Sequence, residues 1–140
     1  MPLVPHRFLV RVAHPCRHVK AMPREDGDRL LELPEVCRLD NFAALDDQRN
    51  FADVRLGWNE LGLGVQVEVA GKDQLPLGDA EHPRTSDGVT LWVDTRDART
   101  SHRASRYCHQ FHLLPTGGGE EKDQPAFLHV HAPEGVVGDE

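Results

Sequence analysis

The sequence predicts an all-β protein, an antiparallel β-sandwich with immunoglobulin-like or jelly-roll-like layers. Apolar residues recur at every second position in several short runs, as in strands that turn one face toward a core. Glycine and proline turn signals separate these runs, and no amphipathic stretch is long enough to connect parallel strands. The chain has 140 residues, which predicts one domain over residues 1–132 and a flexible tail over 133–140.

The N-terminal part carries the weaker patterns. Apolar and charged residues alternate over 7–12, which predicts a first strand that ends near Pro15. A short second strand is expected over 30–33, before Pro34. Apolar residues recur at helical spacing over 35–48, which predicts one or two helical turns there.

The clearest unit is a β-hairpin over residues 51–70. Ala52, Val54, Leu56 and Trp58 alternate with polar residues, and a second alternating run follows Gly62. Gly62 is free to take a positive φ angle in the connecting turn. The two runs therefore predict a hairpin with one face over a core, and Trp58 is expected in that core.

A second hairpin is expected after a loop over residues 71–86. The strand over 87–95 carries bulky residues on both faces, which predicts a central strand covered on both sides. The chain returns over 105–114, forms a flexible loop over 116–124 and ends with a strand over 127–130.

Composition excludes some function classes. The formal net charge is −7, which argues against the basic surface that binds nucleic acid. The sequence shows neither a signal peptide nor a membrane span, so a cytoplasmic location is expected. The three cysteines, Cys16, Cys37 and Cys108, cannot all pair within the chain, which favours a reducing compartment.

Histidines near the second hairpin are the candidate metal ligands. His102, His109 and His112 lie close together in sequence with Cys108, and zinc accepts such ligands. In an extended strand, however, Cys108 and His112 point to one face and His109 to the other, so a hydrogen-bonded strand is favoured over a metal site. His129 and His131 share a face of the last strand, an arrangement that some metal sites use.

The sequence does not predict an enzyme. No serine lies in a GxSxG motif, and Cys108 and His109 face opposite sides of a strand. Asp87 and Asp94 would lie about 23 Å apart along one strand, which is too far for paired acid and base catalysis. They are expected to cap the two ends of that strand.

Trp92 and the hairpin end beside it are the candidate ligand site. Trp92 shares its face with Thr90 and Asp94, so both packing and stacking against a sugar remain open. Arg96, His102 and Arg103 extend from the hairpin end and offer donors to sugar hydroxyls or carboxylates. The alternative is a solvated charged loop.

Residues 52–67 and 86–94 resemble the family 9 carbohydrate-binding modules and their DOMON-like relatives. The shared features are a strand that ends in Trp58-Asn59, a turn, an apolar strand, and later the strand from Asp87 to Asp94. The resemblance covers about residues 30–115. It implies a β-sandwich that binds saccharides, often as a non-catalytic module of glycan-degrading enzymes, sometimes with structural calcium.

The resemblance does not supply the family's ligand residues, and the chain departs from the family at its C-terminal end. Trp58 and Trp92 match positions that usually serve the core, and the sugar-stacking tryptophans and calcium ligands of the family lie outside the matched motifs. Only 25 residues follow Pro115, so the sandwich is expected to be C-terminally incomplete, with open sheet edges that favour self-association. The sequence therefore predicts a saccharide-binding module. The alternatives are a protein-interaction scaffold and a metal-dependent enzyme built on His102, His109 and His112.

Overall fold

The computed structural model describes residues 11–20, 22, 31–97 and 105–131. These residues form six strands and three short 3-10 helices, and the strands make two three-stranded sheets. The chain divides into two units, Met1–Asp73 and Gln74–Glu140, and each holds one sheet. The all-β class is confirmed, whereas the sandwich arrangement of layers stays a prediction. None of the described helices is long and apolar enough to cross a membrane.

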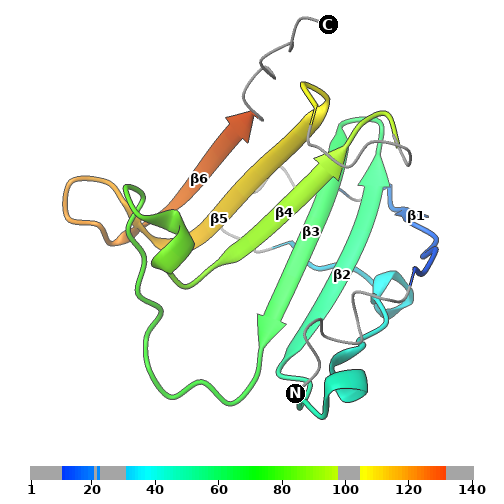
Figure 1. Cartoon of the computed structure of the whole chain (residues 1–140), viewed down its shortest axis with the longest axis horizontal. Coiled ribbons are helices and arrows are strands. Elements are labelled where there is room, and N and C mark those ends of the chain that lie inside the picture. The colour runs from blue at the N-terminus through cyan, green and yellow to red at the C-terminus, as the bar shows by residue number, and fades with distance from the viewer. Residues whose placement is uncertain (1–10, 21, 23–30, 98–104, 132–140) are drawn as a thin grey trace, which may run out of the picture. The chain divides into compact units, whose positions relative to one another are not determined.

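The first unit contains the predicted hairpin. β1 (Arg17–His18) pairs in parallel with β2 (Ala52–Asn59), which pairs antiparallel with β3 (Gly62–Val69) (Figure 1). Asn59 and Gly62 are the last paired residues of the hairpin, so Glu60 and Leu61 form the turn. The Asn59 Oδ1 accepts the Leu61 N–H at 2.9 Å, and Gly62 has a φ of 154° that side chains rarely allow. The turn chemistry expected from the sequence is confirmed.

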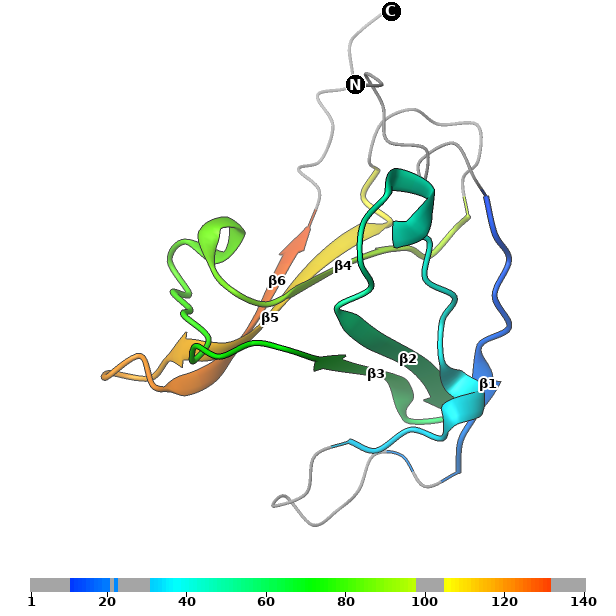
Figure 2. The ribbon, with the colours of Figure 1, turned by 90° about the horizontal axis from the view of Figure 1, so that it is seen from below.

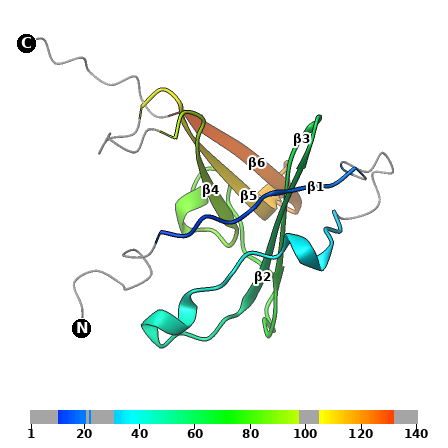
Figure 3. The same cartoon turned by 90° about the vertical axis from the view of Figure 1, so that its right-hand side faces the viewer.

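A segment that precedes β2 in the chain covers one face of this hairpin. Leu33 and Cys37 are fully buried there, beside Met22. A Cβ atom on Gly57 would lie 3.2 Å from the Leu33 side chain, and one on Gly64 would collide with Met22. The two glycines therefore let this segment approach the sheet closely, and Figure 3 shows the part that carries η2 (Glu35–Cys37) to one side of β2.

Polar side chains of the hairpin also hold this segment. The Arg55 Nη1 donates to the Leu33 carbonyl at 2.7 Å, and the Gln66 Oε1 accepts the Leu33 N–H at 2.5 Å. Asp53 forms ion pairs with Arg38 at 2.5 Å and Arg55 at 3.2 Å. The backbone of Leu33 therefore bonds to side chains rather than to a strand, and the strand predicted over 30–33 is wrong for its described part, 31–33.

The remaining predictions for the first unit have mixed outcomes. Helical turns are confirmed, as η2 and as η3 (Ala43–Asp46) (Figure 2). Most of the strand predicted over 7–12 lies outside the described residues. Residues 11–12 are described, and they are not in a strand. The core position predicted for Trp58 is wrong, because its side chain is 43 % exposed and meets the His18 ring edge-on at 4.9 Å.

The second unit is an antiparallel sheet in the order β4 (Val89–Asp94), β5 (Cys108–Gly118), β6 (Gln124–His131). Figure 1 shows β5 between the other two. The prediction that the strand ending at Asp94 is central and covered on both sides is wrong. β4 pairs with β5 alone among the described residues, and Trp92 on one of its faces is 70 % exposed. The large side chains on both faces of β4 are therefore an apolar set on one face and the exposed Trp92 indole on the other.

The strand β5 is longer than predicted and continues through residues expected to be loop. Its pairing with β6 shifts in register between Leu114 and Gly118. Residues 76–80 lie against this irregular stretch, because Thr116 Oγ1 donates to the Pro76 carbonyl and Ala80 N–H to the Gly117 carbonyl. The consecutive glycines therefore permit a close backbone approach rather than a flexible loop. The predicted loop over 71–86 is otherwise confirmed, with one 3-10 turn, η4 (Pro83–Thr85).

Candidate functional site

The strands of the second unit alternate between two faces with different chemistry. We call one the Trp92 face; it carries Thr90, Trp92, Gln110, His112, Leu114 and Val130. We call the other the histidine face; it carries Leu91, Val93, His109, Phe111, Phe127 and His129. The described register therefore separates His109 from His112, as the strand alternation predicts.

The Trp92 face is closed at one end and open at the other. His112 and Leu114 are each only 3 % exposed. Farther along the sheet, Trp92 lies opposite Gln110 and its indole is exposed. Val130, across from Gln110 on β6, is also exposed. A large aromatic ring is thus presented to solvent next to a part of the sheet that is fixed by burial.

A row of hydrogen bonds lines the Trp92 face. The Gln110 Nε2 donates to the His112 Nε2 at 2.8 Å, which makes this ring nitrogen the acceptor. The other ring nitrogen, Nδ1, then carries the proton and donates to the Thr90 Oγ1 at 3.0 Å. Both ring nitrogens of His112 are therefore hydrogen-bonded, and the row holds the Gln110 amide in place beside Trp92.

Two arginine guanidinium groups lie over one tyrosine ring where β4 ends and β5 begins. The Arg96 guanidinium lies 3.6 Å from the centre of the Tyr107 ring, and that of Arg106 lies 4.9 Å from it. Arg106 also donates to the Tyr107 hydroxyl at 2.6 Å. The Asp94 Oδ1 accepts the Arg96 N–H at 3.0 Å. These contacts hold Arg96 two residues beyond the end of β4.

The structure describes two of the four residues of the predicted ligand site, Trp92 and Arg96. Trp92 and Arg96 both lie in the C-terminal half of β4 or just beyond it. His102 and Arg103 lie outside the described residues. Gln110 and Tyr107 were not among the predicted site residues. The alternation of β5 could have placed Gln110 on the Trp92 side only once the pairing of β4 with β5 was known.

Of the predicted metal ligands, His102 lies outside the described residues, and His109 and His112 do not come together. His109 and His112 lie on opposite faces of β5, and both ring nitrogens of His112 are bonded to Gln110 and Thr90. His112 therefore has no nitrogen available for a metal unless those bonds break. The three cysteines are free, and the Cys108 Sγ accepts the Ser105 N–H at 3.4 Å.

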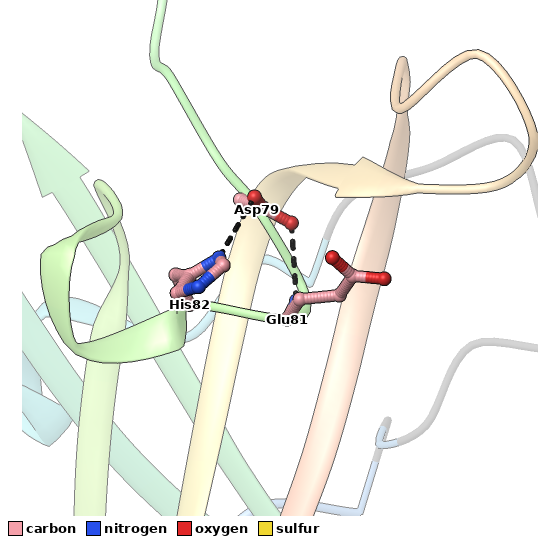
Figure 4. A group of neighbouring side chains, drawn as sticks. All are labelled: Asp79, Glu81 and His82. Atoms are coloured by element: carbon pink, nitrogen blue, oxygen red, sulfur yellow. Dashed lines mark hydrogen bonds and ion pairs between the residues drawn. The ribbon is translucent and has the colours of Figure 1, made fainter.

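Asp79, Glu81 and His82 form a cluster that bears on the calcium implied by the family resemblance. Each offers a ligand atom, and these atoms lie within 4.8 Å of one another. Figure 4 shows the Asp79 carboxylate directed at the His82 ring and at the Glu81 N–H, whereas the Glu81 carboxylate points away. Lys122 forms an ion pair with the same carboxylate at 3.1 Å.

This cluster does not fit calcium. Calcium takes about six to eight oxygen ligands, whereas this group offers one ring nitrogen and two carboxylates. The Asp79 carboxylate is already paired with the Lys122 ammonium group. The Glu81 N–H, followed by His82 and Lys122, lowers the pKa of Asp79 to about 2. The Asp79 side chain therefore acts as a structural clasp between its own loop and the turn after β5.

The first unit also has a hollow at the start of β2, with a volume of about 530 Å³. Asn41, Asn50 and Phe51 are among its lining residues. The Asn41 Nδ2 donates to the Asn50 Oδ1 at 2.8 Å, and Asn50 Oδ1 also accepts the Ala52 N–H. Asp53, at the same hollow, has a pKa lowered by its bonds from Arg55 and Arg38. The polar groups here are engaged with one another.

Comparisons with known proteins name no relative: no protein-family model, curated protein or solved structure matches this chain.

Proposed function

We propose that the chain is a non-catalytic saccharide-binding protein whose platform is Trp92. The observation that carries this proposal is an indole that is 70 % exposed on a sheet face where the neighbouring polar groups are fixed. Aromatic rings stack on the C–H faces of sugars, and polar groups at the ring edge bond the hydroxyls. Trp92 and Gln110 supply these two elements from paired positions of β4 and β5.

Arg96 supplies the charged part of the proposed site. Its guanidinium lies over the Tyr107 ring at 3.6 Å, and such a group presents several donors in one plane. Oxygen-rich ligands, including acidic sugars, are bound well by this geometry. Because the stacked guanidinium is already oriented, little side-chain freedom is lost when it binds.

The family resemblance supports the proposal less than the exposed indole does. The resemblance assigns Trp92 to a core position on an inner strand, and β4 is instead an edge strand of its sheet among the described residues. Among the described residues the Trp92 indole is mostly exposed, so its size is not explained by packing there. The proposal therefore depends on the Trp92 face and not on the layering of the sandwich.

The test uses the fact that the chain has two tryptophans, Trp58 and Trp92. Trp58→Phe leaves Trp92 as the sole indole, and Trp92→Phe leaves Trp58. A glycan array with the full chain identifies a saccharide, which is then titrated into both variants while tryptophan emission is recorded. We expect the emission of Trp58→Phe to shift on binding and that of Trp92→Phe to stay constant.

Trp92→Ala and Phe127→Ala form the matched pair for affinity. Both side chains are largely exposed, and they lie on opposite faces of the same sheet. We expect Trp92→Ala to weaken binding at least tenfold and Phe127→Ala to leave it unchanged. A folded protein that binds no saccharide on the array, or binding that survives Trp92→Ala, would overturn the proposal.

A second candidate function is protein recognition by the outer edge of β4. This edge has no strand partner among the residues that the structure describes, and an extended peptide can add to such an edge. Self-association of the chain would use the same edge. A pull-down partner or dimer that is insensitive to saccharide and to Trp92→Ala would favour this function over sugar binding.

A further inference from the structure

On the histidine face, histidines of two strands lie close together, near the start of β5 and the end of β6. His109 lies near the start of β5, and the register pairs it with His131, the last residue of β6. His129 precedes His131 by two residues and pairs with Phe111. Two histidines two apart on one strand and a third on the next strand form a compact group of positions.

The described side chains of this group already have the spacing of metal ligands. The rings of His109 and His129 are hydrogen-bonded to each other, with the His109 Nδ1 3.1 Å from the His129 Nε2. Two nitrogens bound to one tetrahedral zinc, each at about 2.0–2.1 Å, lie about 3.3 Å apart. A small separation of the two rings would therefore place both nitrogens on one ion.

Phe111 fixes the orientation of both rings. Its ring stacks on that of His129 with centroids 4.5 Å apart and on that of His109 at 6.3 Å. The Phe127 ring in turn stacks on the Phe111 ring, with centroids 5.7 Å apart. Rings held by packing lose little freedom when they bind an ion, which raises affinity.

We propose that His109 and His129 bind one divalent transition-metal ion. Imidazole nitrogen is a preferred ligand of zinc, copper and nickel and a poor one for calcium and magnesium. Two histidine ligands leave the other positions of a tetrahedral ion for water or small anions. This set differs from the histidines that the sequence predicted, because His112 lies on the opposite face.

The site is independent of the proposed saccharide site. Trp92 and Gln110 lie on one face of the sheet and His109 and His129 on the other. Loss of one activity is therefore expected to leave the other in place, and each proposal can fail alone.

The experiment titrates zinc into the full chain, produced without a histidine tag and freed of metal by chelator, in a calorimeter. We expect one equivalent to bind. Cobalt should then give the visible absorption of a tetrahedral complex. We expect His109→Ala and His129→Ala each to weaken zinc binding at least tenfold.

His82→Ala is the matched control, because His82 is an exposed histidine of the Asp79 cluster on a separate loop. We expect this variant to bind zinc as the unchanged chain does. Absence of stoichiometric zinc binding, or full binding by His129→Ala, would overturn the proposal. Zinc binding that is lost in His82→Ala and kept in His129→Ala would instead assign the metal to the Asp79 cluster.

A second measurement covers variants that fail to fold. Copper(II) added to the unaltered chain broadens nuclear magnetic resonance signals of nearby nuclei. We expect the ring signals of His109 and His129 to broaden before those of His112. Equal broadening of all histidine signals would contradict a defined site.

Discussion

The two units each hold a three-stranded sheet, but they use its faces differently. In the first unit a preceding segment covers one face of the hairpin and buries Leu33 and Cys37 completely. In the second unit burial is concentrated at His112 and Leu114, while Trp92 and Phe127 are mostly exposed. One face of the first sheet therefore forms a core with the covering segment, whereas the second sheet exposes an aromatic ring on each face.

The strand sequences explain this difference. The hairpin of the first unit carries Gly57 and Gly64 on its covered face, and both positions lie against the covering segment. A strand glycine weakens the strand but lets another chain segment approach its backbone. The corresponding sheet of the second unit carries large aromatic and imidazole rings in its strands, which fix one another by stacking.

The largest loss of stability is expected from truncating Leu33 in the core of the first unit. We expect Leu33→Ala to lower the free energy of unfolding by about 2–5 kcal/mol, because a fully buried leucine leaves a cavity. Leu61→Ala is the control in the same unit, since Leu61 is 79 % exposed. Its effect should stay within about 0.5 kcal/mol. Urea unfolding measures both, and equal losses would show that the covering segment does not form the core of the first unit.

Two glycines with positive φ angles, one in each unit, differ in the space around them. Gly71 has a φ of 71° with open space around it, whereas a Cβ atom on Gly117, with a φ of 104°, would meet the Gly78 backbone at 2.5 Å. We expect Gly71→Ala to destabilise by about 1–2 kcal/mol through its backbone angle alone.

Gly117→Ala adds a steric overlap to the same backbone strain. We expect it to destabilise by about 3 kcal/mol, because overpacking adds to the unfavourable angle. Urea unfolding again gives both values. If the two variants lose the same stability, the close approach of residues 76–80 to β5 would be contradicted.

Sequence patterns could predict the elements whose causes are local. The hairpin of the first unit follows from alternation and from a turn that Asn59 and Gly62 determine over a few residues. The helical turns over 35–48 follow in the same way. The expected strand at residues 31–33 failed because the backbone of Leu33 bonds to Arg55 and Gln66, which are distant in sequence.

Pairing between distant segments accounts for the other failures. Alternation shows which residues of β4 share a face, but not that the strand lies at an edge of its sheet among the described residues. Glycines at the end of β5 have no side-chain pattern, so the strand could not be extended through them. For the candidate site, Trp92 and Arg96 were predicted, whereas Gln110 and the approach of His129 to His109 depend on the strand register.

Asp79 provides a pH-dependent contrast within the second unit. Its pKa is lowered to about 2 in the folded chain, below about 3.9 in an unfolded chain. A lowered folded pKa stabilises the fold above the unfolded value, and this stabilisation is lost as the pH falls through the folded value. We expect Asp79→Asn to melt below the unaltered chain at pH 6.

The difference in melting temperature between Asp79→Asn and the unaltered chain should shrink between about pH 4 and pH 2. Glu81→Gln is the control, since its carboxylate points away from Asp79 (Figure 4). It should track the unaltered chain over this range. A constant gap for Asp79→Asn from pH 6 to pH 2 would mean that its carboxylate charge does not act as the clasp.

The smallest expected change in stability is at Trp92. Its indole is 70 % exposed, so Trp92→Ala should change the free energy of unfolding by no more than about 0.5 kcal/mol. Urea unfolding of this variant beside Leu33→Ala compares the two units directly: one large apolar side chain stabilises its unit and the other does not. A loss of several kcal/mol in Trp92→Ala would assign the indole to packing, and the case for a saccharide platform on that face would fail with it.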